Sequence, residues 1–179
     1  MTGDGLTDIV SVRNGEVAYW ALQTLGVWSR RVVMARAPVF PPDFDPTMLR
    51  LVDVDGDGLS DIVYFGVDGV DVWFNRLGVE WSDPVTIPVA GFARSQAVVV
   101  DLLGAGRPGV LWSAPGVGDR LVYRLLSFGV VPDDRLLVEI RGGLGHVARV
   151  LYGTSAAHRQ RDEADGRAWP TFLPFSIPV

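Results

Sequence analysis

A nine-residue motif occurs twice in this chain, 53 positions apart. Residues 2–10 read Thr-Gly-Asp-Gly-Leu-Thr-Asp-Ile-Val, and residues 55–63 read Asp-Gly-Asp-Gly-Leu-Ser-Asp-Ile-Val. The similarity continues past the motif, because residues 17–20 (Val-Ala-Tyr-Trp) match residues 70–73 (Val-Asp-Val-Trp) at the same spacing. A repeat of about 50 residues with several short strands is typical of β-propeller blades, which bury their faces against one another. The chain is therefore predicted to be a series of stacked units.

The residues around the motif favour strands over helices. Residues 48–52 and 62–65 flank the second copy, and together they carry β-branched and aromatic side chains, chiefly in residues 62–65, which are enriched in strands. The pairs Asn14-Gly15 and Asp68-Gly69 are typical of β-hairpin turns. Each unit is thus predicted to contain a loop followed by strands that are joined by tight turns.

A third copy of the motif starts at Asp101, 48 positions after Asp53. It keeps the glycines, but positions 3, 5 and 9 hold Leu103, Ala105 and Gly109, so this loop is predicted to bind no metal. Three units fill residues 1–135, too few to close a ring. The chain also begins inside the first motif, so we expect it to be a fragment whose remaining blades lie before Met1 or come from other copies.

Residues 136–179 depart from the repeat. Residues 136–141 and 146–152 flank a Gly-Gly-Leu-Gly turn and predict a hairpin. Residues 153–167 are polar without apolar periodicity, which predicts a loop with no more than one helical turn. Three prolines in residues 169–179 predict an extended tail. The predicted fold class is all-β, with propeller blades over residues 1–135 and a hairpin and extended segment over residues 136–179.

The second copy of the motif lies in a loop that carries four carboxylates at positions 1, 3, 5 and 9 of residues 53–61. Carboxylates this close repel one another unless a cation neutralises them. Oxygen ligands in a flexible loop suit Ca²⁺ better than Mg²⁺. The predicted ligands are the side chains of Asp53, Asp55, Asp57 and Asp61 and the backbone carbonyl of Leu59. The corresponding residues of the first copy, Asp4, Leu6 and Asp8, predict a weaker site.

The acidic loop has three other interpretations. An EF-hand needs a glutamate at position 12, where this chain has Tyr64, and it needs flanking helices. A phosphatase-type motif with Asp53 as nucleophile requires a lysine, and all sixteen basic residues here are arginine. A metal-free turn, in which aspartates accept backbone hydrogen bonds, remains the alternative.

The bulk properties exclude several classes of function. The net charge of −5 argues against a nucleic-acid partner, and no apolar run approaches the roughly 18 residues of a membrane span. The two histidines, His146 and His158, stand near no serine or cysteine motif, so we expect no enzymatic activity. The six tryptophans recur with the units and are interpreted as packing between units rather than as a sugar-binding platform.

Two resemblances follow from these motifs. The acidic units resemble FG-GAP/VCBS repeats, the calcium-loop blades of integrin-like propellers, over residues 1–135. Residues 142–145, 150–152, 154–155 and 169–179 resemble the segment that follows the propeller in the B component of insecticidal toxin complexes, a family related to SpvB-type virulence proteins and to proteins with Rhs/YD repeats. The departures are the degenerate third loop and Ser176, where the family more often has proline.

The resemblance implies a role in assembly. In that family the propeller lies at the mouth of a hollow shell that encloses a toxic polypeptide, docks on the channel-forming component and gates the exit of the cargo. The expected partners are the remaining blades and the shell-forming and channel-forming components, without direct membrane insertion, and the expected location is secreted from bacteria. The alternative is a calcium-dependent adhesion or carbohydrate-binding propeller.

Overall fold

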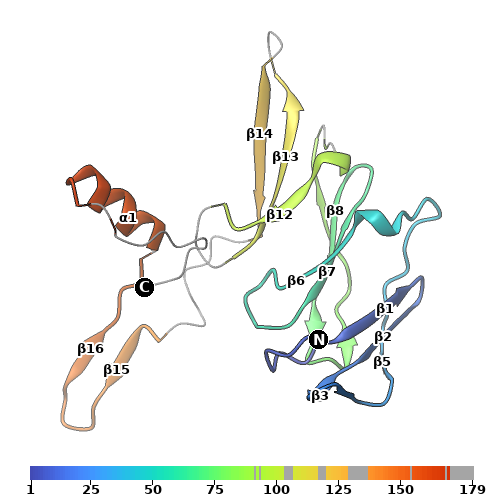
Figure 1. Cartoon of the computed structure of the whole chain (residues 1–179), viewed down its shortest axis with the longest axis horizontal. Coiled ribbons are helices and arrows are strands. Elements are labelled where there is room, and N and C mark those ends of the chain that lie inside the picture. The colour runs from blue at the N-terminus through green and yellow to red at the C-terminus, as the bar shows by residue number, and fades with distance from the viewer. Residues whose placement is uncertain are drawn as a thin grey trace.

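The computed structural model describes residues 1–90, 92, 94–102, 107–116, 120–128, 137–153, 155–167 and 169. These residues form antiparallel sheets and one α-helix (Figure 1). Three sheets of three or four strands follow one another along the chain, and we call them the first, second and third units. The first and second units each include a small separate hairpin. The all-β class predicted from the sequence is confirmed.

The first unit has a three-stranded sheet in the order β1-β2-β5. Its strands are β1 (Ile9–Arg13), β2 (Glu16–Trp20) and β5 (Val32–Met34). A small separate hairpin joins β3 (Leu22–Thr24) to β4 (Val27–Trp28). The predicted turn at residues 14–15 connects β1 to β2, and Gly15 adopts the positive φ of 75° that such a turn requires.

The second unit has a four-stranded sheet in the order β11-β8-β7-β6 and its own small hairpin. A short 3₁₀ helix (Pro46–Met48), capped by the side chain of Asp45, leads into it. The sheet strands are β6 (Leu49–Val52), β7 (Asp61–Phe65), β8 (Gly69–Trp73) and β11 (Val85–Pro88), and the hairpin strands are β9 (Asn75–Arg76) and β10 (Glu80–Trp81).

The third unit contains β12 (Val98–Val100), β13 (Gly109–Pro115) and β14 (Leu121–Ser127), after a 3₁₀ turn at Arg94–Gln96. Its β13–β14 hairpin is longer than those of the other units and projects away from them (Figure 1).

The first and second units repeat the same hydrogen bonds 53 positions apart. The N–H of Ala21 donates to Oγ of Ser29 at 2.9 Å, and the N–H of Phe74 donates to Oγ of Ser82 at 2.9 Å. The N–H groups of the two serines donate back to the carbonyls of Ala21 and Phe74, at 2.8 and 2.9 Å. The sequence repeat is therefore a structural repeat.

Two apolar cores cover the two faces of the second unit. All five residues of β7 are buried. Because side chains alternate along a strand, Ile62 and Tyr64 join the core shared with the first unit, and Val63 and Phe65 join the core shared with the third. Three of the six tryptophans are buried in these cores, as predicted for packing between units: Trp73, Trp81 and Trp112. The prediction fails for Trp28, which is 38% exposed on β4.

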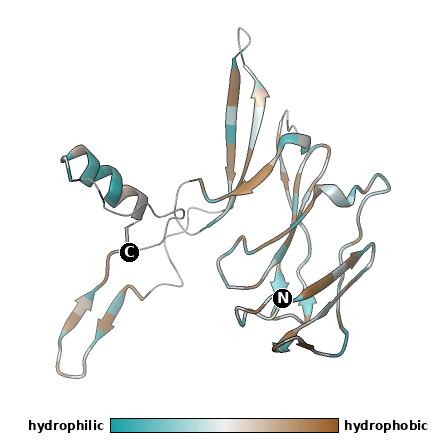
Figure 2. Cartoon of the chain, in the orientation of Figure 1, coloured by the Kyte–Doolittle hydropathy of each residue, from teal (hydrophilic) through white to brown (hydrophobic). Residues whose placement is uncertain are grey.

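The C-terminal part contains a hairpin of β15 (Glu139–Arg141) and β16 (Val147–Arg149), as predicted, and the helix α1 (Ser155–Ala164). The prediction of a loop at residues 153–167 was wrong. The helix forms without an apolar face because alanine, arginine, glutamine and glutamate have high helix propensity, and an ion pair joins Arg159 to Glu163 one turn later. Figure 2 shows that α1 is largely hydrophilic.

Two predictions about this part fall outside the described residues. The boundary predicted at residue 135 lies within residues 129–136, and of the predicted extended tail only Trp169 is described. The Nε1 of Trp169 donates to the carboxylate of Asp162 at 2.8 Å. Within the described ranges, no helix has the length and apolar character needed to cross a membrane.

Candidate metal loop

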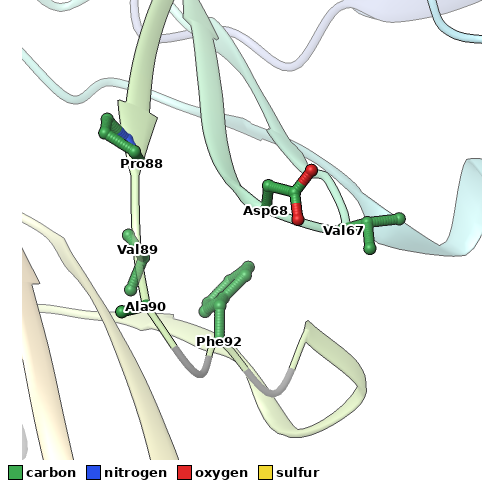
Figure 3. Close-up of a pocket in the computed structure, with 6 residues that line it drawn as sticks. All are labelled: Val67, Asp68, Pro88, Val89, Ala90 and Phe92. Carbon is green, nitrogen blue, oxygen red and sulfur yellow. The ribbon is translucent and has the colours of Figure 1, made fainter.

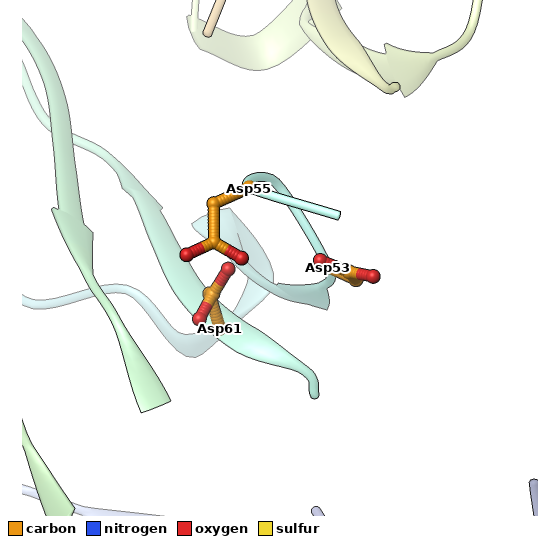
Figure 4. Close-up of side chains that lie close together, drawn as sticks. All are labelled: Asp53, Asp55 and Asp61. Carbon is orange, nitrogen blue, oxygen red and sulfur yellow. The ribbon is translucent and has the colours of Figure 1, made fainter. Parts of the chain in front are cut away.

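The acidic loop, residues 53–60, joins β6 to β7, and Asp61 is the first residue of β7. Carboxylate oxygens of Asp53, Asp55 and Asp61 all lie within 4.8 Å of one another. Figure 4 shows the carboxylates of Asp55 and Asp61 facing each other, with Asp53 to one side. Three oxygen ligands that come this close match the donors that Ca²⁺ prefers.

The loop is shaped by its first aspartate. The carboxylate of Asp53 accepts hydrogen bonds from the N–H groups of Gly56 at 2.6 Å, Asp57 at 3.1 Å and Gly58 at 2.8 Å. Gly56 and Gly58 have φ values of 78° and 83°, which non-glycine residues rarely adopt. The glycines therefore allow the backbone to wrap around this carboxylate.

Asp61 is 1% exposed and holds both ends of the loop together. Its Oδ2 accepts the N–H of Val54 at 3.0 Å, and its Oδ1 accepts the N–H of Asn75 at 2.8 Å. Burial raises the pKa of Asp61 to about 7, and the charges of Asp55 and Asp57 add to the rise, although the two backbone hydrogen bonds lower it. A positive charge at this cluster would favour the ionised carboxylate.

Of the other two predicted ligands, the side chain of Asp57 lies outside this group. The Oδ1 of Asp57 accepts the N–H of Leu59 at 2.8 Å. The side chain of Leu59 is buried, which fixes the turn that carries its carbonyl. Asp53, Asp55 and Asp61 therefore form the centre of the candidate site.

In the first loop Asp8 forms contacts that correspond to those of Asp61, but in the described residues no group of three carboxylates lies there. The Oδ2 of Asp8 forms an ion pair with the amine of Met1 at 2.8 Å, in the place that the Val54 N–H has in the second unit, and Oδ1 accepts the N–H of Leu22 at 3.2 Å. Asp4 accepts the N–H of Leu6 at 2.9 Å. In the described part of the chain, the group of Asp53, Asp55 and Asp61 is the one cluster of this kind.

The charge balance at Asp8 differs accordingly. Burial raises the pKa of Asp8, but the hydrogen bond with the Met1 amine and those from the N–H groups of Thr2 and Leu22 outweigh it and hold the pKa below its ordinary value. This carboxylate is thus already compensated by protein groups.

The third loop lies beside the acidic loop. Residues 103–106, which include the predicted replacements Leu103 and Ala105, are outside the described residues, and Gly109 begins β13. A Cβ at Gly56 would lie 3.9 Å from Nε of Arg107. The third loop thus brings an arginine close to the acidic loop, and its lack of a metal stays a prediction.

Sequence reasoning missed Asn75, a buried residue of β9. Its side chain donates to the carbonyls of Met1 at 3.1 Å and Ser60 at 3.2 Å, and it accepts the N–H of Gly78 at 2.7 Å. The one available signal was a polar residue at the position that Leu22 occupies in the first unit.

Within the described residues, the remaining candidates do not assemble into a second site. His146 is exposed beside the β15–β16 turn, and His158 lies on α1. A shallow pocket of about 490 Å³ lies at the opposite end of β7 from the acidic loop (Figure 3). It is lined by Val67, Asp68, Pro88, Val89, Ala90 and Phe92.

The repeated units and the acidic loop define a class of protein, since residues 1–64 match the FG-GAP-like repeat. Residues 76–179, more than half of the chain, match the insecticide toxin TcdB middle/N-terminal region. The chain belongs to this toxin family. Comparison with curated protein sequences found no match.

Several solved structures share the fold. A crystal structure of TcdB2-TccC3-TEV is 22% identical with a TM-score of 0.77, over 98% of this chain and 8% of that chain. The Photorhabdus luminescens Tc holotoxin pore is 23% identical with a TM-score of 0.78, over 99% and 8%. TcdB2-TccC3 is 20% identical with a TM-score of 0.73, over 99% and 9%. The chain thus spans less than a tenth of the length of these chains.

Proposed function

We propose that this chain is a non-catalytic structural and docking segment of a secreted bacterial toxin complex. It forms part of the propeller that gates a toxin-enclosing shell and docks on the channel-forming component. The observation that carries the proposal is family membership over residues 76–179, together with a fold that follows those toxin-complex structures across 98–99% of the chain.

One exposed turn supports a docking role. Leu77, between β9 and β10, is 83% exposed, and Val79 is 66% exposed. The first unit contacts this turn, where the N–H of Ala35 donates to the carbonyl of Val79 at 2.9 Å, and leaves Leu77 uncovered. Leu77 has a φ of 57°, a conformation that costs a non-glycine residue about 1–3 kcal/mol. An apolar side chain held in this way suits an anchor for a protein surface.

The first unit presents the same feature. Leu25, in the turn between β3 and β4, is 101% exposed and has a φ of 34°. In both turns the leucine is followed by glycine and valine. The two leucines are 52 positions apart, one residue off the 53-residue repeat, and each lies in the turn of the corresponding small hairpin, which favours a repeated contact along one surface.

Calcium binding belongs to the same proposal. Asp53, Asp55 and Asp61, with Asp57 and the carbonyl of Leu59 as further candidates, would hold Ca²⁺. The support is the group of three carboxylates within 4.8 Å and the raised pKa of Asp61, which burial raises most and the charges of Asp55 and Asp57 raise further. A bound cation would offset this repulsion and hold the loop between β6 and β7 in one shape.

The adhesion or carbohydrate-binding alternative receives less support. A sugar platform needs exposed aromatic faces, whereas Trp73, Trp81 and Trp112 are each at most 5% exposed and serve the packing between units. The exposed Trp28 and Tyr123 lie in different units, on β4 and β14.

Binding of the intact protein that carries this segment to its channel-forming component tests the docking role. Leu77→Glu is expected to weaken that binding about tenfold or more, as loss of an interface anchor does. The matched control is Val67→Glu, at the other end of β7, where the side chain is 60% exposed. Unchanged binding of Leu77→Glu, or equal loss with Val67→Glu, would contradict docking through this turn.

A further inference from the structure

The turn that carries Leu77 is anchored by one buried side chain, that of Asn75. Asn75 is 2% exposed. Its Oδ1 accepts the N–H of Gly78 at 2.7 Å, and its Nδ2 donates to the carbonyls of Met1 at 3.1 Å and Ser60 at 3.2 Å. A side-chain amide has two donor hydrogens and one acceptor oxygen, so each polar group of Asn75 is used.

The backbone of Asn75 extends this network into the acidic loop. Its N–H donates to Oδ1 of Asp61 at 2.8 Å, and Oδ2 of Asp61 accepts the N–H of Val54 at 3.0 Å. Asn75 therefore contacts the start of the first unit, the end of the acidic loop and the exposed turn. Through Asp61 it is also linked to the start of the acidic loop.

The first unit also holds the turn from a second direction. Ala35 donates its N–H to the carbonyl of Val79 at 2.9 Å and accepts the N–H of Trp81 at 3.1 Å. Gly78 has a φ of 71°, and a Cβ there would lie 2.9 Å from the hydroxyl of Tyr19. The position of the turn thus depends on how the first two units meet.

The equivalent residue of the first unit is Leu22, 53 positions earlier. Its apolar side chain cannot form the hydrogen bonds that Asn75 forms. The turn at Leu25 is therefore not anchored in this way, although it exposes the same residue types. Both turns expose a leucine, but of the two it is the Leu77 turn that a buried asparagine holds in place.

We propose that Asn75 is a positioning residue that fixes the Leu77 turn against the first unit, so that the docking surface is complete only while the junction of the two units is closed. The inference rests on the docking role proposed above. Asn75 acts through the turn and does not itself contact the partner.

The test replaces Asn75 with the residue of the first unit, Asn75→Leu, in the intact protein. Hydrogen exchange of peptides that cover residues 1–8 and 75–80 is expected to become about tenfold faster or more, because buried carbonyl and N–H groups lose their partners. Exchange in β13 and β14 is expected to stay at the wild-type rate. Affinity for the channel-forming component should fall together with the protection of the turn.

Leu77→Glu provides the comparison, because it removes the anchor and leaves the network intact. It is expected to weaken partner binding with wild-type exchange at residues 75–80. If Asn75→Leu opens the turn while neither variant changes binding, the docking role fails and only the anchoring of the turn by Asn75 survives. If Asn75→Leu leaves exchange unchanged, or speeds it equally in β13 and β14, the positioning role is overturned.

A second variant keeps the test informative if Asn75→Leu does not fold. Gly78→Ala perturbs the same turn through strain at positive φ and contact with Tyr19, with Asn75 in place. Faster exchange at residues 75–80 with weaker partner binding supports the dependence of docking on the position of the turn. An opened turn with unchanged partner binding contradicts it.

Discussion

The first and second units have the same hydrogen-bonding frame around loops of different chemistry. In the second unit Asp61 accepts the N–H groups of Val54 and Asn75. In the first unit Asp8 pairs with the amine of Met1, 53 positions before Val54, accepts the N–H of Leu22, 53 positions before Asn75, and also accepts the N–H of Thr2. Only the second loop brings two further carboxylates to this aspartate among the described residues.

The difference separates two roles that the repeated motif combines. The aspartate at position 9 ties the loop to the strands whether or not a cation is present, because its partners are backbone groups. The additional carboxylates create repulsion that a cation would relieve. We therefore expect both units to lose stability when the hydrogen bonds of this aspartate are removed, and the second unit to be stabilised by calcium.

The largest effect is expected from Asp61→Ala and Asp8→Ala. Asp61→Ala leaves two buried backbone N–H groups unpaired, which should lower the free energy of unfolding by about 2–4 kcal/mol in chelator, and Asp8→Ala should cost less because the N–H groups of Thr2 and Leu22 are exposed or half-buried. Denaturant unfolding measures this, and Asp83→Ala, whose side chain is 87% exposed, should change stability by less than about 0.5 kcal/mol. Stabilisation by calcium should disappear in Asp61→Ala and persist in Asp8→Ala. Loss of the calcium response in both variants would show that the two loops form one site.

Calcium itself should have the next largest effect. A cation at a hundredfold excess over its Kd stabilises the folded state by about 2.7 kcal/mol. Calorimetric titration of Asp55→Asn should show affinity lowered about tenfold or more, with a smaller loss for Asp57→Asn, whose carboxylate lies outside the group of three. Asp101→Asn should bind calcium as the wild type does. Identical unfolding in calcium and in chelator would identify the loop as a metal-free turn.

The two aspartates should respond to pH with opposite signs. The pKa of Asp61 is raised to about 7, so without calcium the folded state retains the proton, and stability falls as pH rises from about 4 to 7. The pKa of Asp8 is lowered, so its contribution is present above its ordinary value of 3.8 and is lost only as pH falls through the lower folded pKa. Calcium affinity should therefore weaken up to about tenfold between pH 7 and pH 6, when protons compete for Asp61. Equal calcium affinity at pH 6 and pH 8 would argue against Asp61 as a ligand.

The smallest effect concerns the part of the frame that both units share. Ser29→Ala and Ser82→Ala each remove the same pair of hydrogen bonds. In one, the serine Oγ accepts a backbone N–H, and in the other the hydroxyl donates to the carbonyl of the next residue. Each is expected to lower the free energy of unfolding by about 0.5–1.5 kcal/mol, and the two values should agree. A clear difference would show that the units are not equivalent outside their loops.

The repeat made much of the fold predictable. A spacing of 53 residues, hairpin turns and alternating side chains are local signals, and they placed the strands of the first two units and the acidic loop. The helix α1 was missed because it has no apolar stripe and depends on propensity and one ion pair. Asn75 could not be predicted because its contact with Met1 spans 74 positions. The orientation of Asp57 is set by a hydrogen bond to Leu59 that spacing alone does not reveal.

The complete burial of β7 has a consequence for how the chain reaches its native state. Each sheet is built from one continuous stretch of the chain, so hairpins in all three units can begin to fold independently. The apolar side chains of β7, however, are covered only after both flanking units have docked. Until then a strand of Ile62, Val63, Tyr64 and Phe65 exposes both faces, and a partly folded chain of this kind is prone to aggregate. The middle unit is therefore the one whose exposure a chaperone or a slow assembly step would have to limit.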